Sequence, residues 1–421
     1  MTDTDTPQPA PSGRASTRVA GKSLSGSTVH VKYRTKITSI RVLKLTFKTD
    51  HHVMTDNDKD WTNSGSLIAK PEWTLGKLSY AVSHTKSQPM AVELEFGVEP
   101  GNADKTIADV IGNAVWDAGS GPLYYLLAAT NQTFKGGTVT VTATLRTTPP
   151  DVVERLLGDI AWSVKTRDDG PFDAGSSTGH EIYFTMDTPD SAPGLEAGIT
   201  QKRLRRSVKR VGRANSDDPH AIAKYLQNLF HGYTLKPSPN VPKEFHHPRY
   251  FAEPGEVESG AGAWAAADYF EEAAECQAII RFVRAAMLQV GCPGEMEIVV
   301  VWADPNNHAK VMEGDWDAGA AGLGNVTKMV NGKQWFASLA DREVEKGDLV
   351  DSGEVFNNFE ACLKLTAGGK TMYYGGGAGD YPSKEDVIQV FSSLCWYSWI
   401  TLADGQRKMR VEQVVKTYGS D

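Results

Sequence analysis

The chain has 421 residues, of which 40% are hydrophobic and 23% are charged, with a formal net charge of −8 at pH 7. This length predicts about two or three domains, and the apolar content predicts buried cores rather than a disordered chain. The acidic balance disfavours nucleic acid and anionic membranes as partners, because it provides no long-range attraction to either.

The cysteine pattern and the N-terminus predict a cytoplasmic protein. The four cysteines all lie in the C-terminal third, and none forms a Cys-x-x-Cys pair. This usage favours a reducing compartment over a disulfide framework or a zinc ribbon. Residues 1–27 are rich in Pro, Ser, Thr and Gly, lack the apolar run of a signal peptide and are expected to be a disordered tail. Export by a route that needs no signal peptide stays open, and no run is long enough to span a membrane.

Residues 28–164 predict an antiparallel β-sandwich. Apolar and polar residues alternate from Val29 onward, and short strand-like runs follow at 90–98, 123–129 and 137–145. Large side chains are available for the core of this domain: Trp61, Trp73 and Trp116.

The segment 165–178 is polar and Gly-rich, and it is expected to be the linker to a second domain at 179–421. That domain opens with a strand at 181–186 and amphipathic helices at 199–214 and 220–229. The first helix is strongly basic. A solvated helix face is one interpretation, and a nucleic-acid or lipid patch is the other.

A cysteine stands at the start of the next predicted helix. Apolar positions follow Cys276 with helical spacing as far as Val290, and Gly291 and Pro293 end the helix before a buried strand at 297–302. The free amides and the positive dipole end of a helix start favour a thiolate, which is the form that attacks an acyl carbon. The alternative is a buried core cysteine, because the position also lies on the apolar face.

This segment resembles the nucleophile helix of transglutaminase-like (papain-related) cysteine enzymes. The similarity lies in the order of Glu275-Cys276-Gln277, an apolar helix, Gly291-Cys292-Pro293 and a strand, with Trp264 upstream. It covers about 35 residues well. The resemblance implies an α+β fold and places Cys276 as the nucleophile in acyl transfer on an amide.

The family's catalytic His opens a later strand, and here that position holds Asn358. An amide has no proton acceptor with a useful pKa, so Asn358 is expected to orient the imidazole or help hold the oxyanion. His308 is the only histidine after Cys276 and is the candidate base, within His308-Ala309-Lys310-Val311. No strand pattern surrounds it, and a surface histidine is the alternative. The matching hairpin is expected at 358–374, with its turn at 367–369.

Metal sites and cofactors are not expected. His246-His247 has no third ligand at a recognisable spacing, and the acids near 304–317 lack calcium-loop spacing. Ser383 and Asp386 form a capping box, which predicts a C-terminal helix continuing to Tyr397.

Two functions remain from the sequence. One is a cysteine-dependent protease, deamidase or transamidase acting on protein or peptide amides, with the β-domain recognising a target. The other is a catalytically degenerate transglutaminase-like domain that serves as a structural or adaptor protein and binds an assembly partner through the β-sandwich. Fold alone does not decide between them.

Overall fold

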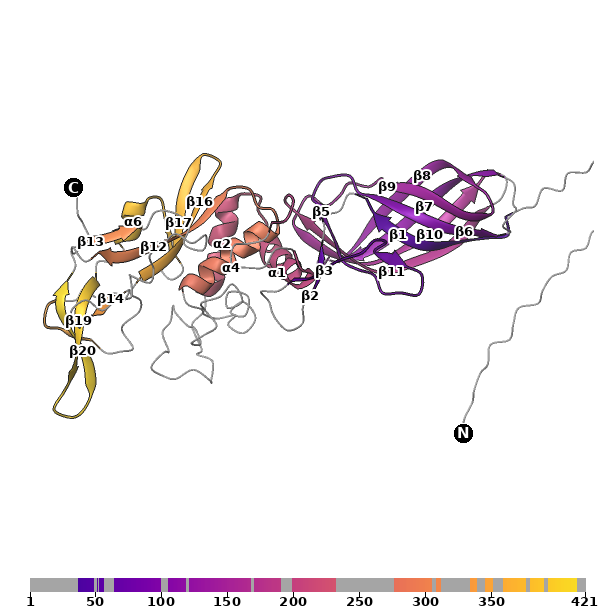
Figure 1. Cartoon of the computed structure of the whole chain (residues 1–421). Helices are drawn as coiled ribbons and strands as arrows, with labels where there is room; N and C mark the ends of the chain where they lie inside the picture. Colours follow the sequence, from indigo (N-terminus) through magenta and orange to yellow (C-terminus); the bar gives the residue numbers. More distant parts are fainter. Residues whose placement is uncertain are drawn as a thin grey trace, which may run out of the picture.

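The structure is a computed structural model of the whole chain. It describes residues 37–48, 51, 53–56, 64–99, 105–118, 121–167, 170–190, 199–231, 276–304, 308–311, 334–338, 345–350, 359–375, 379–389 and 393–414. Figure 1 shows a large sheet at one end of an elongated molecule, helices in the middle and smaller sheets at the other end. Among the described residues no helix is long and apolar enough to cross a membrane.

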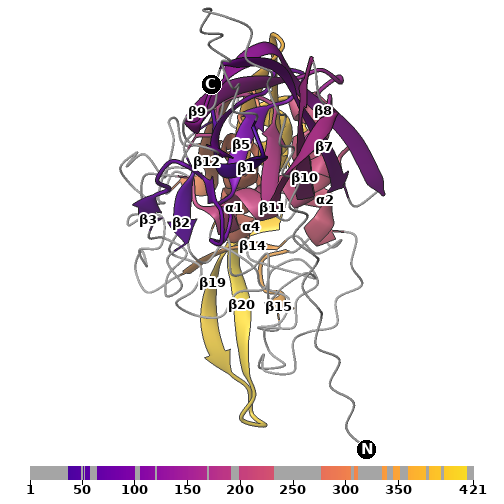
Figure 2. The same cartoon turned by 90° about the vertical axis from the view of Figure 1, so that its right-hand side faces the viewer.

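The N-terminal region is β-rich as expected, but it forms one curled sheet in place of two stacked ones. The sheet has nine strands in the order β4-β1-β6-β9-β8-β7-β10-β11-β5, and only the β5–β11 pair is parallel. Its strands are β1 (Ser39–Phe47), β4 (Trp73–Thr74), β5 (Val82–Thr85), β6 (Ala91–Glu99), β7 (Thr106–Asp117), β8 (Pro122–Phe134), β9 (Gly137–Leu145), β10 (Glu154–Thr166) and β11 (Pro171–Thr185). Figure 2 looks onto this end, where β1 and β11 lie beside each other although they are far apart in the strand order.

Alternating burial along these strands builds the core inside the curl. In β6 every second residue is buried, and Trp73 and Trp116 are buried as predicted, whereas Trp61 lies outside the described residues. Trp162 is a third buried tryptophan that the sequence reading did not identify. Gly112 makes room for it, because a Cβ at that position would lie 2.4 Å from Cζ3 of Trp162.

The prediction of a linker at 165–178 is wrong, since this segment is part of the sheet. Residues up to Thr166 finish β10, and Pro171 begins β11, which pairs with β10 as far as Phe184. The polar, Gly-rich composition arises because one face of β11 is open to solvent over this stretch. The boundaries at 164 and 179 therefore fall within paired strands.

Three helices follow. The second and third pack against a five-stranded sheet, whereas the first packs on the third and on β10 and β11 of the large sheet. The helices are α1 (Gln201–Gly212), α2 (Pro219–His231) and α4 (Cys276–Gln289), and all three lie where the sequence predicts helices. The sheet has the order β13-β12-β16-β17-β18, built from β12 (Glu295–Asp304), β13 (His308–Val311), β16 (Phe359–Ala367), β17 (Lys370–Gly375) and β18 (Gly379–Tyr381). The predicted β16–β17 hairpin is confirmed, and its turn uses Gly368 and Gly369 with φ of 57° and 76°.

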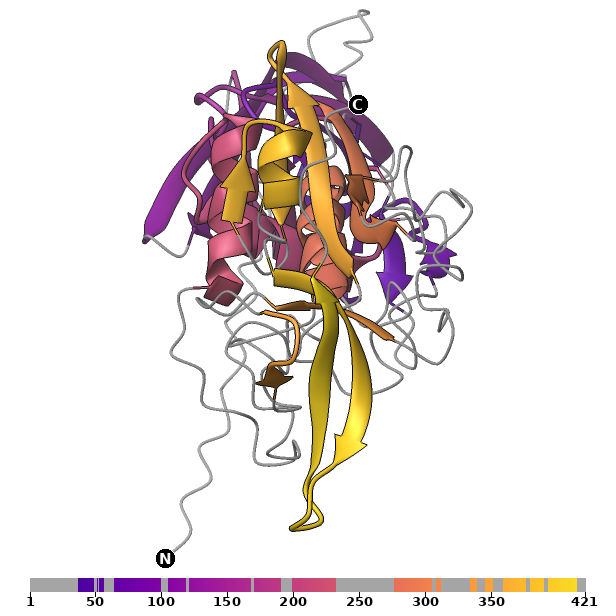
Figure 3. The ribbon, with the colours of Figure 1, turned by 90° about the vertical axis from the view of Figure 1, so that its left-hand side faces the viewer.

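The C-terminal helix is much shorter than predicted. α6 spans only Lys384–Gln389, capped as expected by Ser383, whose Oγ accepts the N–H of Asp386 at 3.1 Å. The chain then forms β19 (Ser393–Thr401), which pairs with β20 (Arg407–Val414) in the sheet β14-β19-β20-β15, with β14 (Gln334–Ser338) and β15 (Leu349–Val350). This β19–β20 hairpin, in yellow, projects from the body of the molecule in Figure 3. A small pair, β2 (Met54–Asp56) and β3 (Ser64–Leu67), completes the strands.

Candidate functional site

Cys276 is the first residue of α4, as the sequence predicts. Buried apolar residues line the helix behind it, including Ile280, Val283 and Met287. The first amides of a helix have no partner within the helix, and the first turn of α4 contains no acidic residue to oppose negative charge. The backbone at Cys276 thus favours an anion.

The turn after α4 sets the direction of the helix relative to the sheet. Gly291 adopts a φ of 63°, and its N–H and that of Cys292 bond back to Leu288 and Met287. The chain then enters β12 at once, and α4 packs on β16. α4 therefore leads into the turn from which β12 departs, and Cys276 lies at the end of the helix away from that turn.

His308 lies at the end of the sheet where β12 finishes. It begins β13 and pairs directly with Asp304, the last residue of β12. The sequence reading found no strand pattern here and was wrong, because four residues are too few for a periodicity to be visible. Hairpin pairing therefore places the candidate base beside the last residue of β12.

Asn358 lies outside the described residues, and the next residue along the chain does not. Phe359 begins β16 and pairs with Trp302 of β12. Because the two strands are antiparallel, β16 begins where β12 approaches its end. Position 358 thus directly precedes a strand that starts beside the last residues of β12.

Strand alternation assigns these positions to a face of the sheet. Ile298 and its register partner Leu363 belong to the hydrophobic core that also contains the buried residues of α4. Because successive strand residues alternate between faces, position 304 is on the same face as Ile298, and so is its direct partner, position 308. Asp304 and His308 are therefore neighbouring positions on the same face of the sheet as Ile298. The sequence reading considered Asp304 only as one of several acids, and the strand register is the signal that distinguishes it.

Two other cysteines are buried thiols without a disulfide, Cys292 and Cys362. Burial is the largest cause that raises the pKa of Cys292 to about 12, and the carboxylates of Asp218 and Asp217 add to it. At neutral pH this thiol is protonated and a poor nucleophile. Cys292 therefore contributes to packing rather than to chemistry.

Two histidines of the described chain have structural roles. His220 Nδ1 lies 3.0 Å from the Tyr374 hydroxyl, and its Nε2 lies 3.2 Å from the Ala367 carbonyl, which ties α2 to the β16–β17 hairpin. His180 belongs to β11 in the large sheet, where its ring nitrogens contact Ser177 and Ser79. Both imidazoles are committed to contacts away from the start of α4.

In the described ranges no group of three His, Cys, Asp or Glu residues could hold a metal ion. The pair at 246–247 lies outside those ranges. A scan against protein-family models and a search of curated proteins found no match to this chain.

Proposed function

We propose that this protein is a cysteine-dependent acyl-transfer enzyme acting on protein or peptide amides, as a protease, deamidase or transamidase. Two observations support the proposal: Cys276 begins α4, and His308 begins β13 opposite Asp304, the last residue of β12. Thiol–imidazole chemistry needs the helix-start thiol within hydrogen-bond reach of a histidine, and the proposal assigns that role to His308.

In the proposed mechanism the Cys276 sulfur attacks the amide carbonyl carbon and forms a C–S bond. The imidazole of His308 takes the thiol proton and passes it to the departing nitrogen, so that the C–N bond breaks and a thioester remains. Water then releases the acid in hydrolysis or deamidation, whereas a second amine forms a new amide in transamidation. The free amides of the first turn of α4 support the developing oxyanion.

Asp304 takes the role of orienting His308 in this proposal. Direct cross-strand partners have Cβ atoms about 4.5–5.5 Å apart, which is within reach of a carboxylate–imidazole hydrogen bond. Asn358 then serves the oxyanion rather than the imidazole. The order of helix, turn, strand and hairpin resembles transglutaminase-like enzymes, and membership of that superfamily is part of the proposal.

Site variants test the chemistry. Activity is measured as ammonia release from glutamine- and asparagine-containing peptides and as cleavage of a fluorogenic peptide library. Cys276→Ala and His308→Ala should each lower the rate by roughly a thousandfold or more, and the double variant should be no slower than either. Asp304→Asn should reduce the rate less, while Cys292→Ala, a control thiol from the core, should leave it close to wild type. Equal activity of Cys276→Ala and wild type would refute the proposal that the protein is a cysteine-dependent enzyme.

The adaptor function is the second candidate, and an exposed apolar strip on the large sheet favours it. Val115 and Tyr124 are direct partners on β7 and β8 and are 49% and 73% exposed. Leu126 extends the strip along β8, and Leu157 extends it onto β10, which pairs with β7. Such surfaces are common at protein interfaces. If the biological effect survives Cys276→Ala and is lost in Tyr124→Asp, the protein acts by binding.

A further inference from the structure

The apolar strip on the outer face of the large sheet has a charged side chain at each end. At one end lies Arg146, whose N–H bonds to the Leu126 carbonyl at 2.7 Å. At the other end lies Asp159 of β10, the direct register partner of Val115. Tyr124 lies between the two ends, because it pairs with Val115 and is two residues from Leu126 along β8. The order across the strip is therefore cation, apolar residues, carboxylate.

Neither end charge is compensated within the described part of the chain. Arg146 and Asp159 are both exposed, and in the ranges that the structure describes neither has an ion-pair partner. Asp117 of β7 adds a second carboxylate at the acidic end. Arg155 lies on β10 as well, but its guanidinium is already bound to Glu181 at 2.6 Å. Each end of the strip can therefore bind the opposite charge of a partner.

The outward positions on the other side of the strip from Leu157 carry no charge. On β7 these are Ile111 and Asn113, and their register partners include Ala128 on β8 and Ala161 on β10. The centres of protein interfaces are depleted of charged residues and enriched in aromatic ones. A strip centred on an exposed tyrosine, with uncharged surroundings and charges only at its ends, has this composition.

We propose that a second copy of this chain covers the apolar strip and forms a symmetric dimer. In a dimer with twofold symmetry the same patch of both copies forms the interface, so the patch must be complementary to itself. A strip with a cation at one end and carboxylates at the other meets this condition after a half-turn. Tyr124 then lies near the axis, and Arg146 binds the partner's Asp159.

The contact is small, so we expect a weak dimer with a Kd on the order of tens of micromolar. The inference concerns the strip on which the adaptor candidate rests. It depends on neither proposed function, because self-association needs no other protein and no chemistry at Cys276.

Sedimentation velocity of the full chain, at concentrations from about 1 µM to about 300 µM, tests the proposal. The average sedimentation coefficient should rise with concentration and level off at the value of a dimer. A chain that stays monomeric over the whole range overturns the inference. So does growth into larger assemblies, because a twofold contact is closed at two copies.

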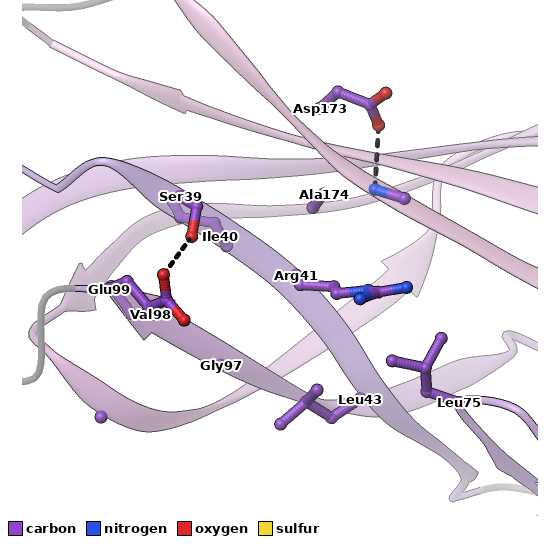
Figure 4. Close-up of a pocket in the computed structure, with 12 residues that line it drawn as sticks. Ser39, Ile40, Arg41, Leu43, Leu75, Gly97, Val98, Glu99, Asp173 and Ala174 are labelled. Atoms are coloured by element: carbon purple, nitrogen blue, oxygen red, sulfur yellow. Dashed lines mark hydrogen bonds between the residues drawn. The ribbon is translucent and has the colours of Figure 1, made fainter. Parts of the chain in front are cut away.

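Charge variants test the arrangement of the two copies. Arg146→Glu should weaken self-association by about tenfold or more, because it places carboxylates opposite each other. Arg41→Glu is the matched control. It makes the same change of charge at another exposed arginine of the large sheet, in the pocket lined by β1, β6 and β11 that Figure 4 shows, and should have no effect. Equal weakening by both variants overturns the proposal, because net charge would then be the cause.

A charge swap and an apolar variant complete the test. Asp159→Lys combined with Arg146→Glu should restore most of the self-association, because opposite charges face each other again. Asp159 accepts a hydrogen bond from the Gly179 N–H at 2.7 Å, so far-UV circular dichroism checks that the double variant is folded. Tyr124→Ser, which leaves that bond intact, should weaken the dimer by about tenfold. Unchanged self-association of a folded Arg146→Glu or Tyr124→Ser variant overturns the proposal, as does a folded double variant that stays as weak as Arg146→Glu alone.

Discussion

His180 lies in β11 with its ring enclosed in the large sheet. Nε2 is 2.8 Å from the Ser177 hydroxyl and Nδ1 is 3.3 Å from the Ser79 hydroxyl, and the residue is 1% exposed. Burial lowers the pKa of His180 from 6.5 to about 4, although the nearby carboxylate of Asp159 acts in the opposite direction. The folded state therefore holds the imidazole neutral at pH values where the unfolded chain binds a proton.

This difference predicts acid sensitivity of the large sheet. The contribution of neutral His180 to stability is complete above the unfolded pKa of 6.5 and is lost as the pH falls towards about 4, because the unfolded chain binds more protons in that window. The loss should be about 3 kcal/mol at most. Urea unfolding at pH 7 and pH 5 measures it, with His180→Gln as the variant that removes the titration. An equal pH dependence in that variant would exclude His180 as the cause.

At the scale of elements, α1 is joined to the large sheet through a buried carboxylate. Glu181 of β11 accepts hydrogen bonds from Arg205 of α1, from Arg155 of β10 at 2.6 Å and from Gln201 at 2.7 Å. Burial acts to raise the pKa of Glu181, but the hydrogen bonds from Arg205 and Tyr183 outweigh it and lower the pKa. Part of the basic run in α1 thus has a structural partner.

Glu181→Gln should destabilise this junction. The amide keeps the shape of the side chain but removes the charge that compensates two guanidinium groups, and the expected loss is about 1–3 kcal/mol of unfolding free energy. The matched control is Glu95→Gln, which breaks the partly exposed pair with Lys44 and should cost less than about 1 kcal/mol. Chemical denaturation of both variants measures the two losses. Similar values for both would mean that the Glu181 network contributes no more than a surface pair.

Whether the sequence predicts an element depends on how regular the spacing of its apolar residues is and on which strands it pairs with. The helix at Cys276 has a long, regular spacing of apolar residues, and the hairpin after Asn358 has a Gly-Gly turn. Both elements are confirmed. The capped start at Ser383 and the apolar run after it predict a helix where the structure has β19. That run is rich in aromatic residues, and pairing with β20 and β14 makes it a strand.

The candidate site shows the same dependence. Cys276 could be identified from local sequence, because a helix start has a local signature. The proximity of Asp304 to His308 could not, because it follows from strand register, which the sequence of either short strand does not determine.

At the scale of the whole molecule, the large sheet and the helices share one junction. The Met186 N–H, just after β11, bonds to the Val290 carbonyl at the end of α4 at 2.8 Å. Tyr183 and Val153 of the large sheet belong to the same hydrophobic core as the helices. β11 thus contributes to both cores, since its neighbour Phe184 faces the other one.

Truncations test this division of the chain. A fragment ending at residue 190 keeps β11 and should unfold cooperatively, although Tyr183 becomes exposed because the helices that pack on it are absent. A fragment ending at residue 164, the boundary expected from the sequence, lacks β11. The core then loses the buried side chains of Ile182 and Phe184, and the fragment should not fold. Near-UV circular dichroism during thermal unfolding distinguishes the two. Cooperative unfolding of the shorter fragment would show that β11 is dispensable for the sheet.

In the proposed enzyme, Cys276 and His308 form an activated thiol–imidazole pair. The pH dependence of alkylation by iodoacetamide, followed by peptide mapping, measures the thiolate at each cysteine of the folded protein. Cys276 should react with an apparent pKa below the ordinary value of about 8.5 and faster than Cys292, and His308→Ala should move that pKa upward. A Cys276 that reacts no faster than Cys292, or whose pH profile is the same without His308, would contradict the pairing.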